Sequence, residues 1–131
     1  MTGETDLERL LADPRPDLDP IEYVFCTLSA DDDSWIELQP VAMIQEAEGR
    51  TVVLPAMMAR SAGLPDQPRF RRITLNVHSS LEAVGFIANL AGRLAAAGIS
   101  TNPLSGYFHD HLFVPTEQAE MALIVLGARD D

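Results

Sequence analysis

The fold of this chain is constrained most by residues 71–78, RRITLNVH, in which polar and apolar side chains alternate. Ile73, Leu75 and Val77 fall on one face of an extended strand, as in a sheet with one buried face. Residues 79–98 follow directly, with apolar side chains at helical spacing and a glycine at the end. A strand that leads straight into an amphipathic helix indicates an α+β domain.

The remaining elements of this half complete a known order. The helix is expected to begin near Ser80, because Ser79 and Glu82 have the spacing of a capping box. Strands are expected at 99–105 and, after the turn GYFHDH, in the segment HLFVP, and Thr116 is expected to cap a last helix. The order is therefore β-α-β-β-α, which is the ferredoxin-like order without its last strand.

The first half follows a similar but looser order, and its strand at 23–28 or 50–55 is expected to supply the missing strand. Its other expected elements are a helix within 5–13 capped by Thr5, a proline-rich linker at 14–20, extended residues at 34–40, and helices at 41–49 and 56–64. We therefore predict an α+β, ferredoxin-like fold of two interleaved βαββαβ-type halves. The halves are residues 1–64 and 65–131, with antiparallel sheets and helices on one face.

Composition excludes several classes of function. The formal net charge of −11 argues against nucleic acid and against an anionic membrane surface as partners. All nine cationic side chains are arginines, which excludes a Schiff-base lysine, a P-loop lysine and a kinase lysine. The single cysteine, Cys26, excludes intrachain disulfides and cysteine-rich zinc sites. Without a secretory leader or a spanning apolar run, a cytoplasmic protein is expected.

Four segments of the chain resemble small bacterial ACT-domain proteins. Their C-terminal half resembles ITLNVHSSLEAVGFIANLAGRLAAAGIS and SGYFHDHLFVPTEQAEMAL, and their N-terminal half resembles EYVFCTL and EGRTVVLPAMMARSAGL. The layout is also similar to the paired ACT modules of the arginine-sensing CASTOR proteins. The resemblance covers nearly the whole chain. It implies a non-catalytic regulatory module with an ACT fold that binds a small ligand, often an amino acid, and needs no cofactor. It also implies a homodimer and a metabolic enzyme as a regulated partner.

The predicted ligand site lies where the strand-to-helix turn meets the hairpin. Backbone N–H groups at the helix N-terminus suit a carboxylate, Ser79 and Ser80 add hydroxyls, and Asp110 suits an ammonium group. A zwitterionic amino acid needs such a pair of opposite partners. The residues predicted to bind the ligand are Val77, His78, Ser79, Ser80, Leu81, Asn102, Gly106, Tyr107, Phe108, His109, Asp110 and His111.

Two alternatives stay open at this point. His109 and His111 lie on one face of an extended strand, and His78 at the same edge would complete a three-nitrogen set for zinc, copper or nickel. Alternatively, the histidines are structural, Ser79 only caps the helix, and the chain is a ligand-free interaction module. A catalytic histidine–aspartate pair is not expected, because residues adjacent in sequence rarely point at each other.

Overall fold

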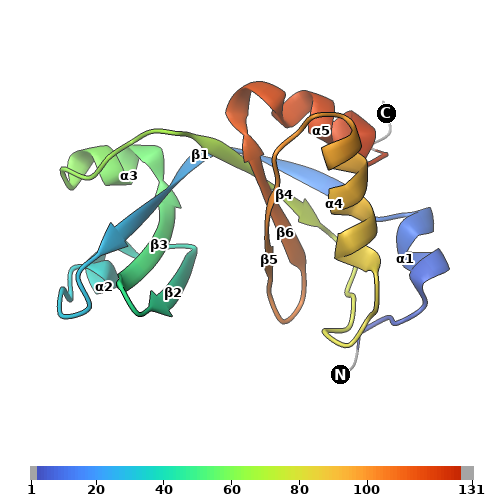
Figure 1. Ribbon diagram of the computed structural model, residues 1–131, viewed down its shortest axis with the longest axis horizontal. Coiled ribbons are helices and arrows are strands. Elements are labelled where there is room, and N and C mark those ends of the chain that lie inside the picture. The colour runs from blue at the N-terminus through green and yellow to red at the C-terminus, as the bar shows by residue number, and fades with distance from the viewer. Residues whose placement is uncertain (1–2, 128–131) are drawn as a thin grey trace. The chain divides into compact units, whose positions relative to one another are not determined.

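The computed structural model describes residues 3–127 of the chain. The chain divides into unit 1, made of Met1–Pro20 and Arg71–Asp131, and unit 2, made of Ile21–Phe70. The elements are α1 (Leu7–Ala12), β1 (Pro16–Leu28), α2 (Trp35–Leu38), β2 (Ala42–Glu46), β3 (Gly49–Pro55), α3 (Ala56–Ser61), β4 (Phe70–Leu75), α4 (Phe86–Ala96), β5 (Asn102–Ser105), β6 (Asp110–Pro115), a 3-10 turn (Thr116–Gln118) and α5 (Ala119–Val125) (Figure 1).

Over the described residues, the strands hydrogen-bond in the order β2-β3-β1-β4-β6-β5. Strand β1 is long enough to serve both units, since Pro16–Pro20 belongs to unit 1 and Ile21–Leu28 to unit 2. The strand that unit 1 needs to complete the ferredoxin-like order is therefore the first part of β1. That part lies within the segment predicted to be a linker, ahead of the predicted strand at 23–28. Pro16 takes the first strand position, where a missing N–H is tolerated, and the pairing with β3 begins at Tyr23, beyond Pro20.

In unit 1, helices α1, α4 and α5 cover one face of the sheet (Figure 1). Strands β5 and β6 form an antiparallel hairpin in which Asn102 pairs with Phe113 and Ser105 with Asp110. The alternation seen in the sequence at β4 points its apolar side chains at these helices. The buried core comprises Leu10, Ile73, Leu75, Phe86, Leu90, Leu94, Ile99, Leu112, Val114, Ala119, Ala122 and Leu126.

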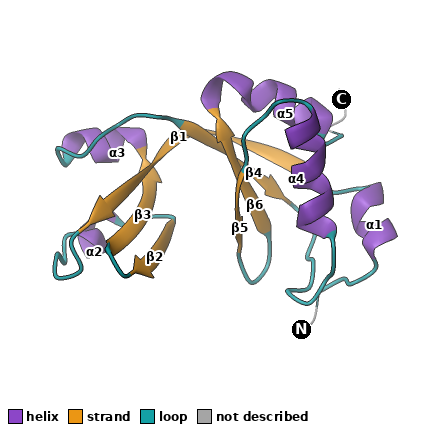
Figure 2. Ribbon diagram, viewed as in Figure 1, coloured by secondary structure: helices purple, strands orange, loops and turns teal. Residues whose placement is uncertain are grey.

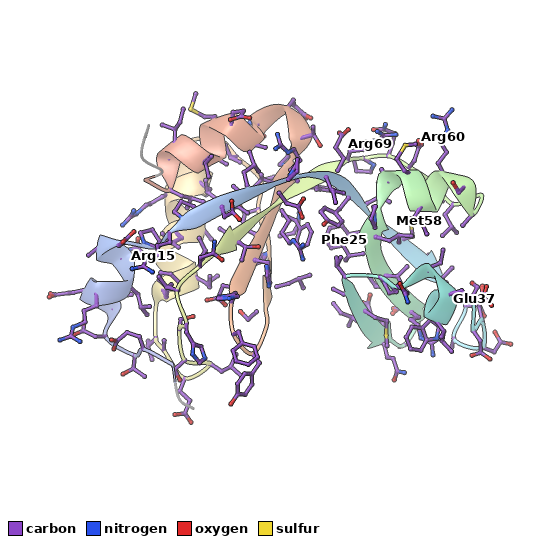
Figure 3. The ribbon with its side chains drawn as sticks, turned by 180° about the vertical axis from the view of Figure 1, so that it is seen from behind. Arg15, Phe25, Glu37, Met58, Arg60 and Arg69 are labelled. Atoms are coloured by element: carbon purple, nitrogen blue, oxygen red, sulfur yellow. The ribbon has the colours of Figure 1, made fainter. Side chains whose placement is uncertain are left out.

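Unit 2 is built on strands β2, β3 and the second part of β1, which pair antiparallel. Its core comprises Val24, Cys26, Leu28, Val52, Leu54, Ala56 and Ala59. Arg69 (Figure 3) holds the segment that leaves α3 in place. Its guanidinium contacts the Asp66 carboxylate at 3.0 Å and the Glu22 carboxylate at 3.3 Å. Burial raises the pKa of the Cys26 thiol, as expected for an inert buried cysteine.

The α+β class and the antiparallel sheet are confirmed, but two predicted elements of the first half are wrong (Figure 2). The segment 41–49, predicted as a helix, contains strand β2, and the residues predicted as extended contain the single helical turn α2. The apolar residues at 41–44 fit either period, and a helix this short is marginal by itself. Pairing with β3 therefore decides the conformation.

Both predicted helix caps outside the site are also wrong. Asp6, not Thr5, caps α1, because its Oδ1 accepts hydrogen bonds from the backbone N–H of Glu8 at 3.0 Å and of Arg9 at 3.4 Å. Thr116 opens a 3-10 turn ahead of α5, and no side-chain hydrogen bond caps that turn among the described residues. None of the helices within residues 3–127 combines the length and the apolar character needed to cross a membrane.

Candidate functional site

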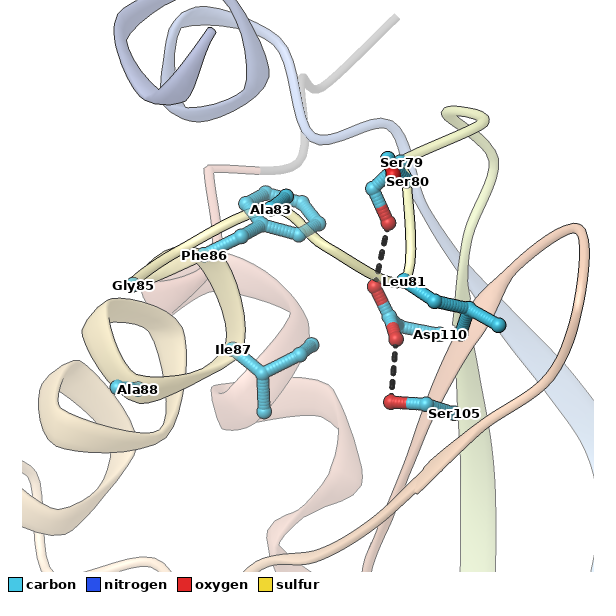
Figure 4. A pocket seen from close by; sticks show the side chains of 10 residues that line it. All are labelled: Ser79, Ser80, Leu81, Ala83, Gly85, Phe86, Ile87, Ala88, Ser105 and Asp110. Atoms are coloured by element: carbon cyan, nitrogen blue, oxygen red, sulfur yellow. Dashed lines mark hydrogen bonds between the residues drawn. The ribbon is translucent and has the colours of Figure 1, made fainter. Parts of the chain in front are cut away.

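The buried carboxylate of Asp110 is the centre of the candidate site. Asp110 is the first residue of β6, and only 7% of it is exposed. The Ser79 hydroxyl donates to its Oδ2 at 2.7 Å, and the Ser105 hydroxyl donates to its Oδ1 at 2.6 Å (Figure 4). A buried charge is tolerated when hydrogen-bond donors face it, and these two hydroxyls fulfil that condition.

A pocket of about 180 Å³ lies beside this carboxylate, between the strand-to-helix loop and the start of α4. It is lined by Ser79, Ser80, Leu81, Ala83, Gly85, Phe86, Ile87, Ala88, Ser105 and Asp110 (Figure 4). All these residues belong to unit 1. No arginine is among them, so the only full charge in the lining is the carboxylate.

Helix α4 presents its N-terminus to the pocket. Its N-cap, Gly85, has φ 91°, a left-handed conformation that suits glycine, and no described side chain caps the helix. The Gly85 carbonyl accepts the first intrahelical bond, from Asn89 N–H at 2.9 Å. The first backbone N–H groups of a helix have no intrahelical acceptor and carry partial positive charge. The pocket therefore combines a carboxylate with a positive helix end.

The prediction that this helix begins near Ser80 is wrong, and the reason lies in the site itself. Strand β4 ends at Leu75, and residues 76–85 form a loop. The Ser79 hydroxyl is committed to Asp110 instead of capping a helix. Ser80 Oγ accepts from Glu82 N–H at 3.0 Å, which closes a local turn. The predicted capping box is thus absent, and Ser79 and Ser80 belong to a loop, residues 76–85, which we call the serine loop. The helix begins at Phe86.

The predicted hairpin residues lie at the turn between β5 and β6. Gly106 N–H donates to the His109 carbonyl at 2.9 Å, which closes the turn and leaves Tyr107 and Phe108 exposed. The His78 ring lies beside them, with centroid distances of 5.6 Å to Phe108 and 6.3 Å to Tyr107. The strand-to-helix loop and the hairpin turn therefore do meet, as expected from the order of the elements.

The three histidines do not gather into a metal site. His111 Nδ1 lies 2.9 Å from Thr74 Oγ1, and His109 Nδ1 lies 3.5 Å from the Val77 carbonyl oxygen. Burial lowers the pKa of His111, and the nearby Arg72 and His109 lower that pKa further against the opposing effect of Asp110. In the described part of the chain, no three His, Cys, Asp or Glu side chains are placed to hold a metal ion. The metal alternative therefore has no support in the geometry.

The structure separates the predicted residues into groups. Ser79, Ser80, Leu81 and Asp110 line the pocket. The other predicted residues lie at the hairpin turn beside it: Val77, His78, Gly106–His109 and His111. Asn102 pairs with Phe113 at the end of β5 that is farther from the pocket, and Asn102 does not line the pocket.

Sequence reasoning missed Ala83, Ser105 and the residues at the start of α4, Gly85–Ala88. One local signal was available, since glycine is an accepted N-cap residue and Gly85 directly precedes an apolar run. No local signal marks Ser105. Its role follows only from its pairing with Asp110 across the hairpin.

Unit 2 places a cation where unit 1 places this carboxylate. Strands β3 and β6 both end in a proline, Pro55 and Pro115. Arg50 precedes Pro55 by the same number of residues as Asp110 precedes Pro115. Arg50 Nη1 donates to the Asp32 carbonyl at 2.9 Å, and its guanidinium carbon lies 5.0 Å from the centre of the Trp35 ring. The first half therefore lacks a carboxylate partner for an ammonium group at this position.

Comparison with known proteins agrees with this architecture. Two ACT-domain family models match the chain, one at residues 2–71 and one at residues 68–127. The chain belongs to the ACT-domain family. The predicted ACT fold is thereby confirmed, whereas no comparison shows the similarity to CASTOR proteins, which stays a prediction. No match was found among curated proteins.

Three solved structures illustrate the relationship of this ACT-domain protein to others. A Vibrio cholerae protein of unknown function, described as a possible transport protein, is 47% identical over 95% of each chain, with a TM-score of 0.86. An Agrobacterium tumefaciens protein is 16% identical over 85% of this chain and 84% of its own, with a TM-score of 0.66. The regulatory subunit of aspartate kinase from Thermus flavus is 12% identical over 85% of this chain and 94% of its own, with a TM-score of 0.61. The last two similarities concern the fold alone.

Proposed function

We propose that this ACT-domain protein is a non-catalytic regulatory module that binds an amino acid or a similar small zwitterion. The observation that carries the proposal is the pocket in which a buried carboxylate, Asp110, faces the uncapped N-terminus of α4. Membership of the ACT-domain family supports a regulatory role, as does the fold shared with aspartate kinase regulatory subunits.

The two ends of the pocket suit the two charges of the ligand. Each carboxylate oxygen of Asp110 accepts one serine hydroxyl and keeps a second lone pair for the α-ammonium group. The N–H groups at the start of α4 suit the α-carboxylate. The volume of about 180 Å³ favours a ligand with a small side chain. Because the lining contains no cationic side chain, an acidic ligand side chain has no oppositely charged side chain to pair with there.

The aromatic residues of the hairpin turn extend the proposed site. The rings of His78, Tyr107 and Phe108 contact one another beside the pocket serines and Asp110, and we include them in the proposed site as partners for a part of the ligand that projects from the pocket. We further propose a cytoplasmic homodimer that regulates a metabolic enzyme, because ACT modules of the kind that this chain resembles usually work in pairs and are often docked to enzymes. Its alternative is an interaction module that binds no ligand.

A thermal-shift panel tests the proposed function. Each of the twenty L-amino acids is added with EDTA present, so that contaminating metal plays no part. Ligand at a hundred times its Kd stabilises a protein by about 2.7 kcal/mol, which is a rise in Tm of roughly 10 °C for a chain of this size. Stabilisation by at least one amino acid is expected.

Two variants with the same change of charge test whether the ligand binds at Asp110. Asp110→Asn removes the proposed ammonium partner, while Asp17→Asn makes the same change at an exposed position of β1 outside the pocket. The shift should disappear in the first variant and persist in the second. Absence of any shift across the panel would contradict amino-acid binding and favour the interaction module. A shift that survives Asp110→Asn would place the ligand elsewhere.

A further inference from the structure

The segment that precedes α1 lies against the loop that carries the pocket serines. Glu4 N–H donates to the His78 carbonyl at 2.7 Å, and Ser80 N–H donates to the Glu4 carbonyl at 2.9 Å. These two bonds form a parallel bridge between Glu4 and Ser79. Ser79 is therefore held on both sides by the main chain of Glu4, while its hydroxyl reaches Asp110.

The approach of the two segments leaves no room for a side chain at residue 3. A Cβ atom on Gly3 would lie 2.6 Å from the carbonyl carbon of Ser79 and 2.7 Å from both the His78 carbonyl oxygen and the Ser80 nitrogen. All three are backbone atoms, so relief requires the loop itself to move. Glycine at this position is thus a condition for the contact, not a matter of turn geometry.

Helix α1 anchors this segment to the core of unit 1. The Glu4 carboxylate accepts from the N–H groups of Thr5 and Asp6, which shapes the entry into the helix, and Leu10 is buried among the core residues. Leu7 approaches the other end of the pocket, since a Cβ on Gly85 would lie 3.5 Å from its Cδ2. The segment before α1 therefore contacts the serine loop, and Leu7 at the start of α1 lies beside Gly85, the N-cap of α4.

We propose that Gly3 and Glu4 are positioning residues of the ligand pocket, and that docking of residues 3–6 is coupled to occupation of the pocket. The inference rests on the proposed function. The docked segment sets the Ser79 hydroxyl opposite Asp110 and thereby shapes the pocket, so a ligand that needs this shape stabilises the docked state. Coupling of this kind is reciprocal, and undocking the segment must weaken the ligand.

The test compares Gly3→Ala with Gly92→Ala, a matched control within α4 where a Cβ meets no atom within 4 Å. The probe is an equimolar mixture of the twenty L-amino acids, titrated well below the unfolding temperature and followed by NMR shifts of the loop amides. Gly3→Ala should need at least about five-fold more of the mixture for half-saturation, whereas Gly92→Ala should match the wild type.

Hydrogen exchange at the Ser80 amide supplies a readout that a purely structural role would not move. In the wild-type protein the mixture should slow this exchange, because the ligand favours the docked segment. In Gly3→Ala the exchange should be fast without the mixture. Glu4→Pro removes the N–H donor to the His78 carbonyl, together with the carboxylate that accepts from the N–H groups of Thr5 and Asp6. It should reproduce both effects and serves as the second variant if Gly3→Ala does not fold.

The outcomes separate this proposal from the proposed function. Wild-type affinity in Gly3→Ala, or Ser80 exchange that is insensitive to the mixture, would overturn the coupling and leave amino-acid binding intact. A wild-type protein that does not respond to the mixture would overturn both. If neither variant folds, the segment is a structural element of unit 1 and the positioning role is wrong.

Discussion

Replacing Ser79 with alanine isolates the hydrogen bond on which the geometry of the pocket depends. The Ser79 hydroxyl donates to Asp110 Oδ2 at 2.7 Å, and both residues are only 7% exposed. Water therefore has little access to take the place of the lost hydroxyl. Hydrogen bonds to charged groups contribute about 1.5–3 kcal/mol. The expected loss of unfolding free energy is of that size, or about 5–10 °C in Tm.

Ser105→Ala is the internal comparison, because it removes the other donor to the same carboxylate. Ser105 is exposed, so water can replace its hydroxyl, and the expected loss is smaller, roughly 0.5–1 kcal/mol. Both variants are measured by urea unfolding followed by far-UV circular dichroism. The slope of free energy against urea should stay unchanged, since neither substitution alters the area buried on folding.

A double-mutant cycle with Asp110→Ala assigns the loss to the pair. The coupling energy between Ser79 and Asp110 should be at least about 1 kcal/mol, because each side chain is the other's buried partner. Equal losses in Ser79→Ala and Ser105→Ala would refute the argument from burial. A coupling energy near zero would show that the bond does not hold the carboxylate.

Three other substitutions or reagents probe separate parts of the chain. Burial, together with Arg72 and His109, lowers the pKa of His111 in the folded protein. As the pH falls below about 6.5, the unfolded chain therefore binds a proton at His111 before the folded chain does, and the free energy of unfolding should decrease. In a plot of the urea midpoint against pH, His111→Gln should flatten this region. Asp6→Ala removes the cap of α1 and should lower the free energy of unfolding, measured in urea, by about 0.5–2 kcal/mol. An unchanged urea midpoint would show that the cap does not stabilise the protein. Cys26, buried and with its pKa raised by burial, should react with iodoacetamide far more slowly in the folded protein than in urea, and equal rates would contradict its burial.

Local pattern was sufficient where a segment has one dominant period. The alternation at 71–78 predicted strand β4, which ends at Leu75, and the spacing of apolar residues predicted the body of α4 and its end near Gly98. Pattern failed where two periods fit equally, as at 41–49, because pairing with β3 and not local preference selects the strand there. It also failed at 14–20, where the prolines indicated a linker. Residues 16–20 instead form the first part of β1, because the sheet holds them in an extended conformation.

The candidate site shows the same division. Ser79, Ser80 and Asp110 were predicted from the order β-α-β-β, because that order brings the strand-to-helix turn and the hairpin to one edge. The serine loop was misread as a helix start, since a capping box and a hydroxyl that binds a distant carboxylate have the same local sequence. Ser105 and the N-terminal segment carried no local signal at all.

By itself, the sequence determined the class of the fold, the acidic and lysine-free character of the chain, and the residues at the edge of the second half. Composition depends on each residue alone, and periodicity depends on residues close together in the chain, so both can be read without knowing the fold. Only the tertiary structure decided that Ser79 meets Asp110, that Glu4 bridges to Ser79, and that β1 serves both units. These contacts join residues far apart in the chain, and the packing of strands and helices that brings them together is a property of the whole fold and of no single segment.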